Sequence, residues 1–349
     1  MFLFDSIDNI RLPFVLYIPK NINQDSSLIL NGITPNQKGS YRDSIEEAKR
    51  VAMEQEFSPI YKKLAVDYNN PMLIPIIPRC IALYTGYLGY DIYHENFERA
   101  IQGYNEGWSD FSPTDLDNFR KLDFQISNMI EYCLFFIKSK YNLELDNKVI
   151  ATGYSASSKM VNYFAALHPD QVKMVIGGGT GGLCILPIKK YNETSLDYPI
   201  GFNDLDDKKL EMFKEIPQFY YIGKDDQTSP NFFVREIEYD GDNPRKDYMG
   251  NTIHKKENGQ FIYRKDKNNK FILSDGGYYS YDQALFILYE LSDDVQERFD
   301  KEQKIYESTG VNALFKKYNG NHIIEDSNLV LDVISFYQNY IKKLPNKKV

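Results

Sequence analysis

The chain has 349 residues, 42% of them hydrophobic and 26% charged, which is typical of a globular protein and excludes a disordered one. Its formal net charge of −8, with acidic and basic residues mixed along the chain, disfavours a nucleic-acid surface, because phosphate binding requires clustered positive charge. The three cysteines form no C-x-x-C pair, so we expect neither a structural zinc site nor a disulfide framework from Cys80, Cys133 and Cys184.

The first residues, Met1 to Phe14, lack a basic region followed by a long apolar segment, so they do not read as a signal peptide. No apolar run approaches the roughly 20 residues that cross a bilayer as a helix. We therefore expect a cytoplasmic protein without a membrane span, although a leader removed from the mature chain is compatible with this sequence.

Strand-like and helix-like segments alternate along most of the chain. Apolar runs predict strands at 14–18, 27–33, 72–77, 149–152, 172–176, 218–222 and 312–318. Helices are expected at 43–53, at 58–68, from Ser112 to about Ile137, from the end of the fourth strand to His168, and at 327–341. Strands that alternate with helices predict one mainly parallel sheet flanked by helices, an α/β fold that we expect to occupy residues 1–349 as a single domain.

Two regions interrupt this alternation. Residues 79–111 are rich in Tyr and Gly and lack periodicity, which predicts a surface excursion that forms a wall of a cleft. Residues 231–292 contain a hairpin-like pair, 260–264 and 270–274, and then a helix. We expect this region to be an insertion that acts as a lid or cap-like wall, because connections of this length in a compact domain are usually functional or disordered.

The sequence Gly-Tyr-Ser-Ala-Ser, residues 153–157, stands where the fourth strand gives way to a helix. A tight turn of this kind pushes a serine hydroxyl out of the backbone, and the helix N-terminus directs amide groups and a positive dipole end at it. Its neighbours must be small because strand and helix run close together. Ser155 is therefore a candidate nucleophile; the alternative is that it only caps the helix.

This turn resembles the nucleophile elbow of the α/β-hydrolases, G-x-S-x-G, with Ser157 in place of the second Gly. The segments PQFYYIGKDDQTSP and VNALFKKYNGNH resemble the acid and histidine segments of that family and follow in the order Ser, acid, His. The stretch GYSASSKMVNYFAALHPDQVKMVIGGGTGG is similar to the elbow region of bacterial serine esterases related to polyhydroxyalkanoate depolymerases. The resemblance implies an α/β-hydrolase fold, with Ser155 as nucleophile and His322 as base.

Two adjacent aspartates compete for the role of the triad acid. The family pattern places the acid three residues after the glycine that ends its strand, which implies Asp226 rather than Asp225. For the oxyanion hole the resemblance implies the amide of Ala156 and one amide of the early loop, from Gly32 or Ile33. The choice between these two stays open, as does a plain turn at that position.

Other conspicuous residues have ordinary interpretations. His168 is expected to cap a helix end, His94 and His254 to lie in solvated loops, and Arg79 to hold an acidic substrate group or to form a surface ion pair. The glycine-rich stretch 177–183 lacks the ending of a phosphate-binding loop, and no group of residues has metal-ligand spacing. We therefore expect neither a nucleotide nor a metal cofactor.

These observations predict a serine hydrolase that cleaves a small-molecule carboxylic ester through an acyl-enzyme on Ser155. A peptidase, amidase or thioesterase with the same triad is the alternative within enzymes. A non-catalytic binding protein of the same fold is the alternative outside them. The sequence indicates neither the acyl-chain preference nor the oligomeric state.

Overall fold

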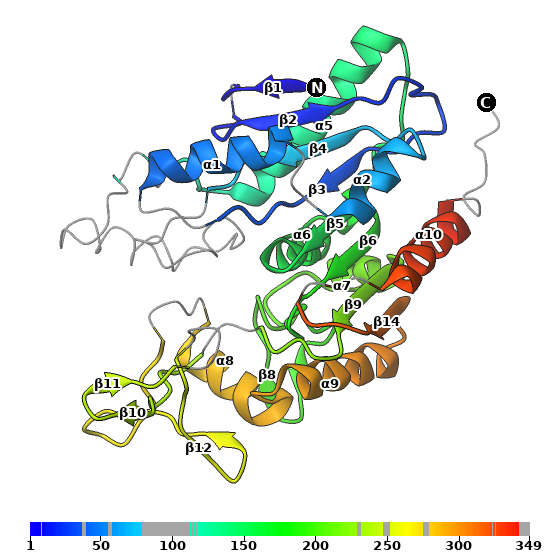
Figure 1. Ribbon diagram of the computed structural model, residues 1–349. Coiled ribbons are helices and arrows are strands. Elements are labelled where there is room, and N and C mark those ends of the chain that lie inside the picture. Colours follow the sequence, from blue (N-terminus) through cyan, green and yellow to red (C-terminus); the bar gives the residue numbers. More distant parts are fainter. Residues whose placement is uncertain are drawn as a thin grey trace.

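The protein is built around one sheet of eight strands, in the order β1-β2-β4-β3-β5-β6-β9-β14 (Figure 1). The computed structural model describes residues 1–7, 9–36, 40–54, 58–78, 112, 115, 117–228, 232–246, 252–274, 279–322, 324 and 326–341. The strands of this sheet are Phe2–Phe4 (β1), Phe14–Tyr17 (β2), Ile29–Asn31 (β3), Met72–Pro75 (β4), Val149–Tyr154 (β5), Val172–Gly178 (β6), Gln218–Gly223 (β9) and Ala313–Tyr318 (β14).

The sheet is mainly parallel, as the sequence predicts. β2 pairs antiparallel with both β1 and β4, whereas every pair from β4 through β3, β5, β6 and β9 to β14 is parallel. Parallel strands need crossover connections that cover the faces of the sheet, so both faces become buried. β5 accordingly reads as a continuous apolar run rather than as an alternating one.

Helices cover both faces of the sheet, in two separate hydrophobic layers. The side chain of Ile29 packs in the layer of α1 (Tyr41–Glu54), α2 (Pro59–Val66) and α10 (Ser327–Ile341). Its neighbours Leu28 and Leu30 point to the opposite face. That face is covered by α5 (Leu122–Tyr141), α6 (Ala156–Leu167), α7 (Asp207–Glu215) and α9 (Val295–Ser308).

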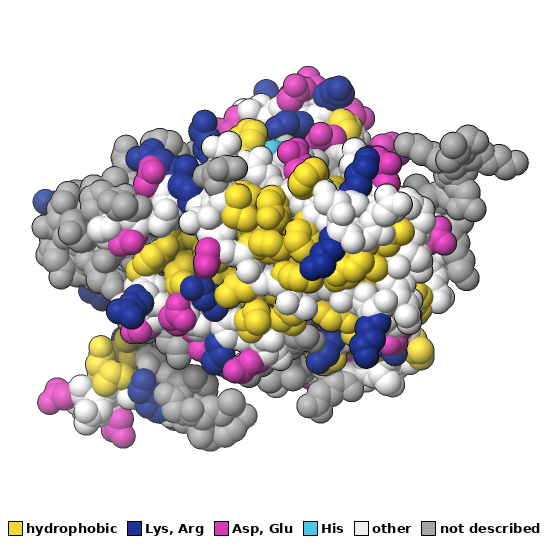
Figure 2. Space-filling model, turned by 90° about the horizontal axis from the view of Figure 1, so that it is seen from above, with side chains coloured by type: hydrophobic (Ala, Val, Ile, Leu, Met, Phe, Trp, Pro, Cys, Tyr) yellow, Lys and Arg dark blue, Asp and Glu magenta, His cyan; other side chains and the backbone are white. Residues whose placement is uncertain are grey.

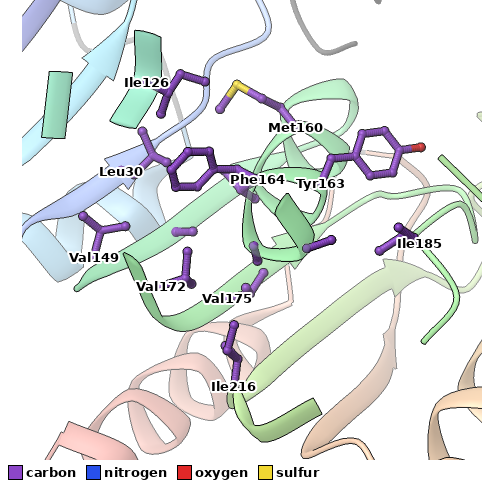
Figure 3. Close-up of a cluster of buried hydrophobic side chains, with 14 of the residues drawn as sticks. Leu30, Ile126, Val149, Met160, Tyr163, Phe164, Val172, Val175, Ile185 and Ile216 are labelled. Carbon is purple, nitrogen blue, oxygen red and sulfur yellow. The ribbon is translucent and has the colours of Figure 1, made fainter. Parts of the chain in front are cut away.

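The helix α6 lies at the centre of the second layer. Figure 3 shows Phe164 of α6 beside Leu30 of β3, with Val172 and Val175 of β6 below them. All residues of α6 except Leu167 are buried, because loops and neighbouring helices cover the side of α6 that faces away from the sheet. A helix that is buried all round is held rigidly, and its first residue follows directly on Ser155.

The helix predicted from Ser112 to about Ile137 is interrupted in the structure. Asp115 and Asp117 are helical and Ser112 Oγ accepts from the amide of Asp115 at 3.1 Å, but this first helical segment does not continue into the second. α5 begins only at Leu122, after Lys121, whose φ of 51° is left-handed and cannot continue a helix. The buried side chain of Gln125 stabilises this break, since its Nε2 donates to the carbonyl oxygens of Asn118 (2.8 Å) and Arg120 (3.0 Å). The edge strand β1 was not predicted either, because three residues carry too short a pattern to detect.

The insertion forms an arm with its own backbone hydrogen bonds, outside the main sheet (Figure 1). Val234, Arg264 and Ile272 are joined in a closed ring, in which each amide donates to the next carbonyl at 2.8–3.0 Å. Two further rings of this kind follow along the arm, one of Glu236, Lys255 and Ile262 and one of Glu238, Arg245 and Ile253. The bond between Ile272 and Arg264 confirms the predicted pairing of 260–264 with 270–274.

The short ladders of the arm are Tyr239–Asp240 (β10), Asn243–Pro244 (β11), Lys256–Glu257 (β12) and Gln260–Phe261 (β13). Two similar strands, Lys190–Tyr191 (β7) and Thr194–Ser195 (β8), pair with each other in the loop after β6. The arm leads into the helix α8 (Tyr281–Phe286), which continues to Leu291 as a π-helix. This helix packs on buried side chains of the loop after β6, including Leu186 and Leu196. The arm is thus rooted in the main body through α8.

Figure 2 shows the face that lies at the top of Figure 1, where hydrophobic side chains form an irregular band between charged ones. Large hydrophobic side chains that are exposed on β1 and α5 include Leu3, Phe124 and Phe135. Apolar side chains therefore reach the surface on the side of the antiparallel strands.

Candidate active site

The protein has the α/β-hydrolase fold that its sequence resembles: a mainly parallel sheet with an antiparallel second strand and helices on both faces. In such sheets ligands bind beyond the carboxyl ends of the parallel strands. Ser155 directly follows β5, Asp226 lies three residues after β9, and His322 lies four residues after β14. All three predicted triad residues therefore lie at the same end of the sheet.

Ser155 has the strained backbone expected of a nucleophile elbow. Its φ of 59° and ψ of −127° lie where side chains are rarely tolerated, and its amide donates to the carbonyl oxygen of Gly178 at 2.8 Å. A Cβ on Gly153 would lie 2.3 Å from the carbonyl oxygen of Ser157, so only glycine fits there. The side chain of Ser155 makes no capping hydrogen bond to α6, which argues against the helix-cap interpretation.

The structure brings Ser155, His322 and Asp226 together in one chain of hydrogen bonds. The distance from Ser155 Oγ to His322 Nε2 is 3.0 Å, and that from His322 Nδ1 to Asp226 Oδ2 is 2.8 Å. The Asp226 side chain is fully buried and also accepts from the amide of Thr228 at 2.8 Å. Asp225 is exposed and stays outside this chain of bonds.

The imidazole of His322 is packed between the last residue of β5, Tyr154, and the first residue after β6, Gly179. The Tyr154 ring lies 5.4 Å from the imidazole, and its hydroxyl donates to the carbonyl oxygen of His322. Burial raises the pKa of Tyr154, so this hydroxyl keeps its proton. On another side, a Cβ on Gly179 would lie 3.1 Å from Cε1 of His322. Only the small size of Gly179, with its φ of +62°, leaves room for the ring.

The loop after β3 lies against the elbow, as the predicted oxyanion hole requires. Thr34 joins the two: its hydroxyl donates to the carbonyl oxygen of Tyr154 at 3.0 Å and accepts from the amide of Ser157 at 3.3 Å. The amide of Gly32 donates to the carbonyl oxygen of Thr152 at 2.8 Å, so it is already used within the sheet. This sheet bond speaks against Gly32 as an oxyanion donor.

Ala156 and Ile33 are the other two donors that the resemblance implies. Ala156 is the first residue of α6, where the amide has no partner one turn earlier in the helix. Gly32 has a structural role instead, since a Cβ there would lie 2.7 Å from that of Ser157. The polar Thr34, directly after Gly32-Ile33, is the signal in the sequence that could have indicated contact with the elbow.

The other candidate residues lie away from the triad or outside the described part of the chain. His168 ends α6 as expected, but its ring binds Asp123 (Nε2 to Oδ2, 3.0 Å) rather than a helix carbonyl. His254 lies in the arm, where it pairs with Ile237. The excursion 79–111, with Arg79, Cys80 and His94, is not described.

Cys133 and Cys184 are both buried free thiols. Among the described residues no three His, Cys, Asp or Glu side chains are grouped so that they could hold a metal ion. None of the helices found within the described ranges is long and apolar enough to cross a bilayer.

Three buried ionisable side chains lie near the glycine-rich loop that follows β6. Arg298 and Glu302 of α9 are fully buried; Arg298 Nε donates to the carbonyl oxygen of Gly181 at 2.7 Å, and Glu302 Oε1 accepts from the amide of Cys184 at 2.5 Å. Lys159 of α6 is the third. Burial raises the pKa of Glu302 to about 8 and lowers the pKa of Lys159 to about 7, because desolvation disfavours both charged forms.

No protein-family model matches the chain, and no curated protein matches it in sequence. Among solved structures, a ferulic acid esterase aligns with a TM-score of 0.44 at 11% identity, over 95% of this chain and 92% of its own. Est1E from Butyrivibrio proteoclasticus aligns with a TM-score of 0.41 at 12% identity, over 98% of this chain and 99% of its own. A Bacillus cereus carboxylesterase has a TM-score of 0.39 at 10% identity, with 95% and 96% covered.

Proposed function

We propose that this protein is a serine hydrolase that cleaves small-molecule carboxylic esters through an acyl-enzyme on Ser155. The observation that carries the proposal is the continuous path from Ser155 Oγ through the imidazole of His322 to the buried Asp226, with heavy-atom distances of 3.0 and 2.8 Å. These distances lie within the reach that proton transfer by a general base requires.

Acylation begins when Ser155 Oγ attacks the ester carbonyl carbon while His322 Nε2 takes the hydroxyl proton. Asp226 accepts the hydrogen bond from Nδ1–H, which fixes the tautomer and stabilises the imidazolium that forms. The negative charge that develops on the carbonyl oxygen is stabilised by the amides of Ala156 and Ile33. The tetrahedral intermediate then collapses, and His322 returns the proton to the departing alkoxide, which leaves as an alcohol.

Deacylation repeats the same steps with water in place of the serine. His322 removes a proton from a water molecule as its oxygen attacks the acyl carbon, and it then protonates Ser155 Oγ as the acid product departs. Each step uses only protons that the triad and water supply, so the mechanism requires no cofactor.

The insertion 231–292 is proposed to form a lid or wall over this site. The insertion follows directly after residues 224–228, the loop after β9 that carries Asp226 and is called the acid loop below. The chain then returns through α8 to α9, and the first turn of α9 contacts the acid loop (Figure 1). An arm rooted at this position lies at the end of the sheet where substrate binds. We expect it to influence which acyl chains are accepted rather than the chemical step.

A fluorophosphonate probe and a series of p-nitrophenyl esters test the proposal together. The probe is expected to label the wild type at Ser155 and to leave Ser155→Ala unlabelled, and the wild type should hydrolyse at least one ester of the series. Turnover of amide and thioester analogues with the same acyl groups is measured in parallel. Faster turnover of an analogue than of the matching ester would favour the alternative hydrolases, and neither labelling nor turnover would favour a binding protein.

A further inference from the structure

The first turn of α9 contacts the loop that carries Asp226, and we propose that Gln296 in this turn is a positioning residue for the triad. This inference rests on the proposed function, since it assigns to Gln296 the task of holding Asp226 against His322. The side-chain amide Nε2 of Gln296 donates to the carbonyl oxygens of both Gly223 and Asp226, at 2.8 Å each.

These two carbonyl groups belong to the two ends of one turn. Gly223 is the last residue of β9, and the amide of Asp226 donates back to its carbonyl oxygen at 3.1 Å. An NH₂ group has two hydrogens and can therefore serve two acceptors at once. Gln296 thus fixes the distance between the end of the strand and the residue whose carboxylate orients the imidazole.

The contact between α9 and the acid loop is made from both sides. Gln227, the next residue of the loop, accepts from the amide of Val295 at 3.4 Å and donates to Asp294 Oδ2 at 3.1 Å. Asp294 is the N-cap of α9, and its other oxygen, Oδ1, accepts from the amide of Glu297 at 2.9 Å. The side chains of loop and helix therefore interlock at the start of α9.

Gln296 also lies against the strand that leads to the base. The backbone carbonyl oxygen of Gln296 accepts from Lys317 Nζ of β14 at 3.2 Å. β14 continues into the turn that carries His322. The acid loop also bonds to the end of β14 and to this turn. The amide of Lys224 donates to the carbonyl oxygen of Tyr318 at 2.8 Å, and the amide of Asp225 donates to that of Gly320 at 3.0 Å. Backbone carbonyl groups at the end of β14 and in the following turn thus bind two amides of the acid loop, whereas Gln296 binds the carbonyl oxygens of Gly223 and Asp226.

Arg298 keeps the turn of α9 itself in place. Its guanidinium is fully buried and donates to Gly181 in the glycine-rich loop at 2.7 Å and to Ser292 at the end of the insertion at 2.8 Å. Gln296 is therefore supported by a helix turn that cannot shift without breaking buried bonds. That rigidity allows a side chain that touches no substrate to set the position of a catalytic one.

The decisive variant is Gln296→Glu, which keeps the shape of the side chain but replaces the donor by oxygens facing two carbonyl groups. We expect kcat for p-nitrophenyl acetate to fall about 10- to 100-fold, because small misplacements of catalytic groups have effects of this size. KM should change by less than about twofold, since no substrate contact is altered. Gln296→Ala, which removes the donors without adding repulsion, should lose less, and it decides the question if Gln296→Glu does not fold.

A double-mutant cycle separates positioning from general loosening of the fold. In an Asp226→Asn background, Gln296→Glu should cost little further rate, because the group through which it acts is already impaired. The matched control is Gln303→Glu on the same helix, whose amide donates only to Glu307, at 2.7 Å, and which should leave kcat unchanged. The free energy of unfolding of each variant is measured in urea alongside the kinetics.

Two results would overturn the inference: wild-type kcat in folded Gln296 variants, or an equal loss of rate in the wild-type and Asp226→Asn backgrounds. A failure of the proposed function gives a different pattern. In that case the wild type hydrolyses no acyl substrate, or Ser155→Ala remains active, whatever residue stands at position 296.

Discussion

At the scale of single residues, the site depends on a serine whose backbone is strained and a histidine whose ring is packed on several sides. Ser155 has a positive φ, and the small Gly153 and Gly179 leave room for the elbow and for the ring of His322. Neither Ser155 nor His322 contributes a large apolar side chain to the core. Removing the Ser155 hydroxyl should therefore cost little stability, whereas removing the His322 ring also leaves the buried carboxylate of Asp226 without its partner.

Ser155→Ala and His322→Ala are each expected to reduce kcat by about 10⁴-fold or more while the protein remains folded. The losses should be far from additive, because the two side chains act in one step. The measurement is ester hydrolysis together with urea unfolding of both single variants and of the double variant. A folded single variant with near wild-type turnover would refute the mechanism.

Asp226 and Asp225 offer a matched pair of neighbouring carboxylates. Asp226→Asn should reduce kcat by about 10⁴-fold, because an amide facing Nδ1 favours the wrong tautomer of His322. Asp225→Asn should have little effect, since its exposed side chain makes no contact with the imidazole. Kinetics of both variants on the same ester decide the assignment, and reversed effects would transfer the role of the acid to Asp225.

The sequence predicted Ser155, Asp226 and His322, which the structure joins by hydrogen bonds, because each closely follows an apolar strand and has a recognisable local pattern. It could not identify Gln296, Tyr154 or Thr34 as their supports. The amide of Gln296 meets a loop 70 residues away in sequence, and only the folded sheet brings the two together. The same holds for Gly32, whose amide is taken by a pairing between strands that the sequence does not specify in register.

At the scale of elements, most strands of the sheet and five of its helices were predictable from pattern alone, but α7, α9 and the interruptions of helices were not. The apolar period of α5 extends towards Ser112, but the buried Gln125 stabilises a break before Leu122 through bonds that no periodicity reveals. The arm shows the converse case. Its turn at 265–269 was predictable from Lys-Asp-Lys-Asn-Asn, whereas the closed rings of hydrogen bonds depend on segments far apart in sequence.

The arm can be removed at a point that the structure supplies. Phe233 and Leu273 are bridge partners at its base, so residues 234–272 can be replaced by a short glycine linker that retains α8 and the buried Phe233. The deletion also removes Tyr263 and Phe271, which pack against the cluster of α8, so the free energy of unfolding of the variant is measured beside its kinetics. If the arm forms part of the substrate wall, the preference among p-nitrophenyl esters of increasing chain length should change more than turnover of the acetate. An unchanged preference in the folded deletion variant would contradict the role of the arm as a lid.

At the scale of the whole molecule, the sheet separates two hydrophobic layers, and the fully buried ionisable side chains of Arg298 and Glu302 lie on the side of α6 and α9. Burial raises the pKa of Glu302 from its ordinary 4.5 to about 8. Between these two values the folded protein holds a proton that the unfolded chain releases. Stability contributed by Glu302 is therefore present below pH 4.5 and is lost as the pH rises towards 8.

Glu302→Gln keeps the oxygen that accepts from Cys184 and never ionises. The difference in unfolding free energy, wild type minus variant, should therefore fall as the pH is raised from 5 to 7, by at most about 1.4 kcal/mol per pH unit. Urea unfolding at several pH values measures this slope. Glu307→Gln, an exposed position on the same helix, is the control and should give a flat difference. A flat difference for Glu302→Gln would show that the buried carboxyl does not titrate as described.

The order of the strands in the sheet has a consequence for the synthesis of the protein. Ser155 is added to the growing chain long before His322, and β14, which presents the histidine, pairs only with β9 at one edge of the sheet. A chain that has not yet reached β14 therefore lacks the predicted base as well. Under the proposed mechanism, the chain of hydrogen bonds from Ser155 through His322 to Asp226 is complete only once β14 has docked beside β9.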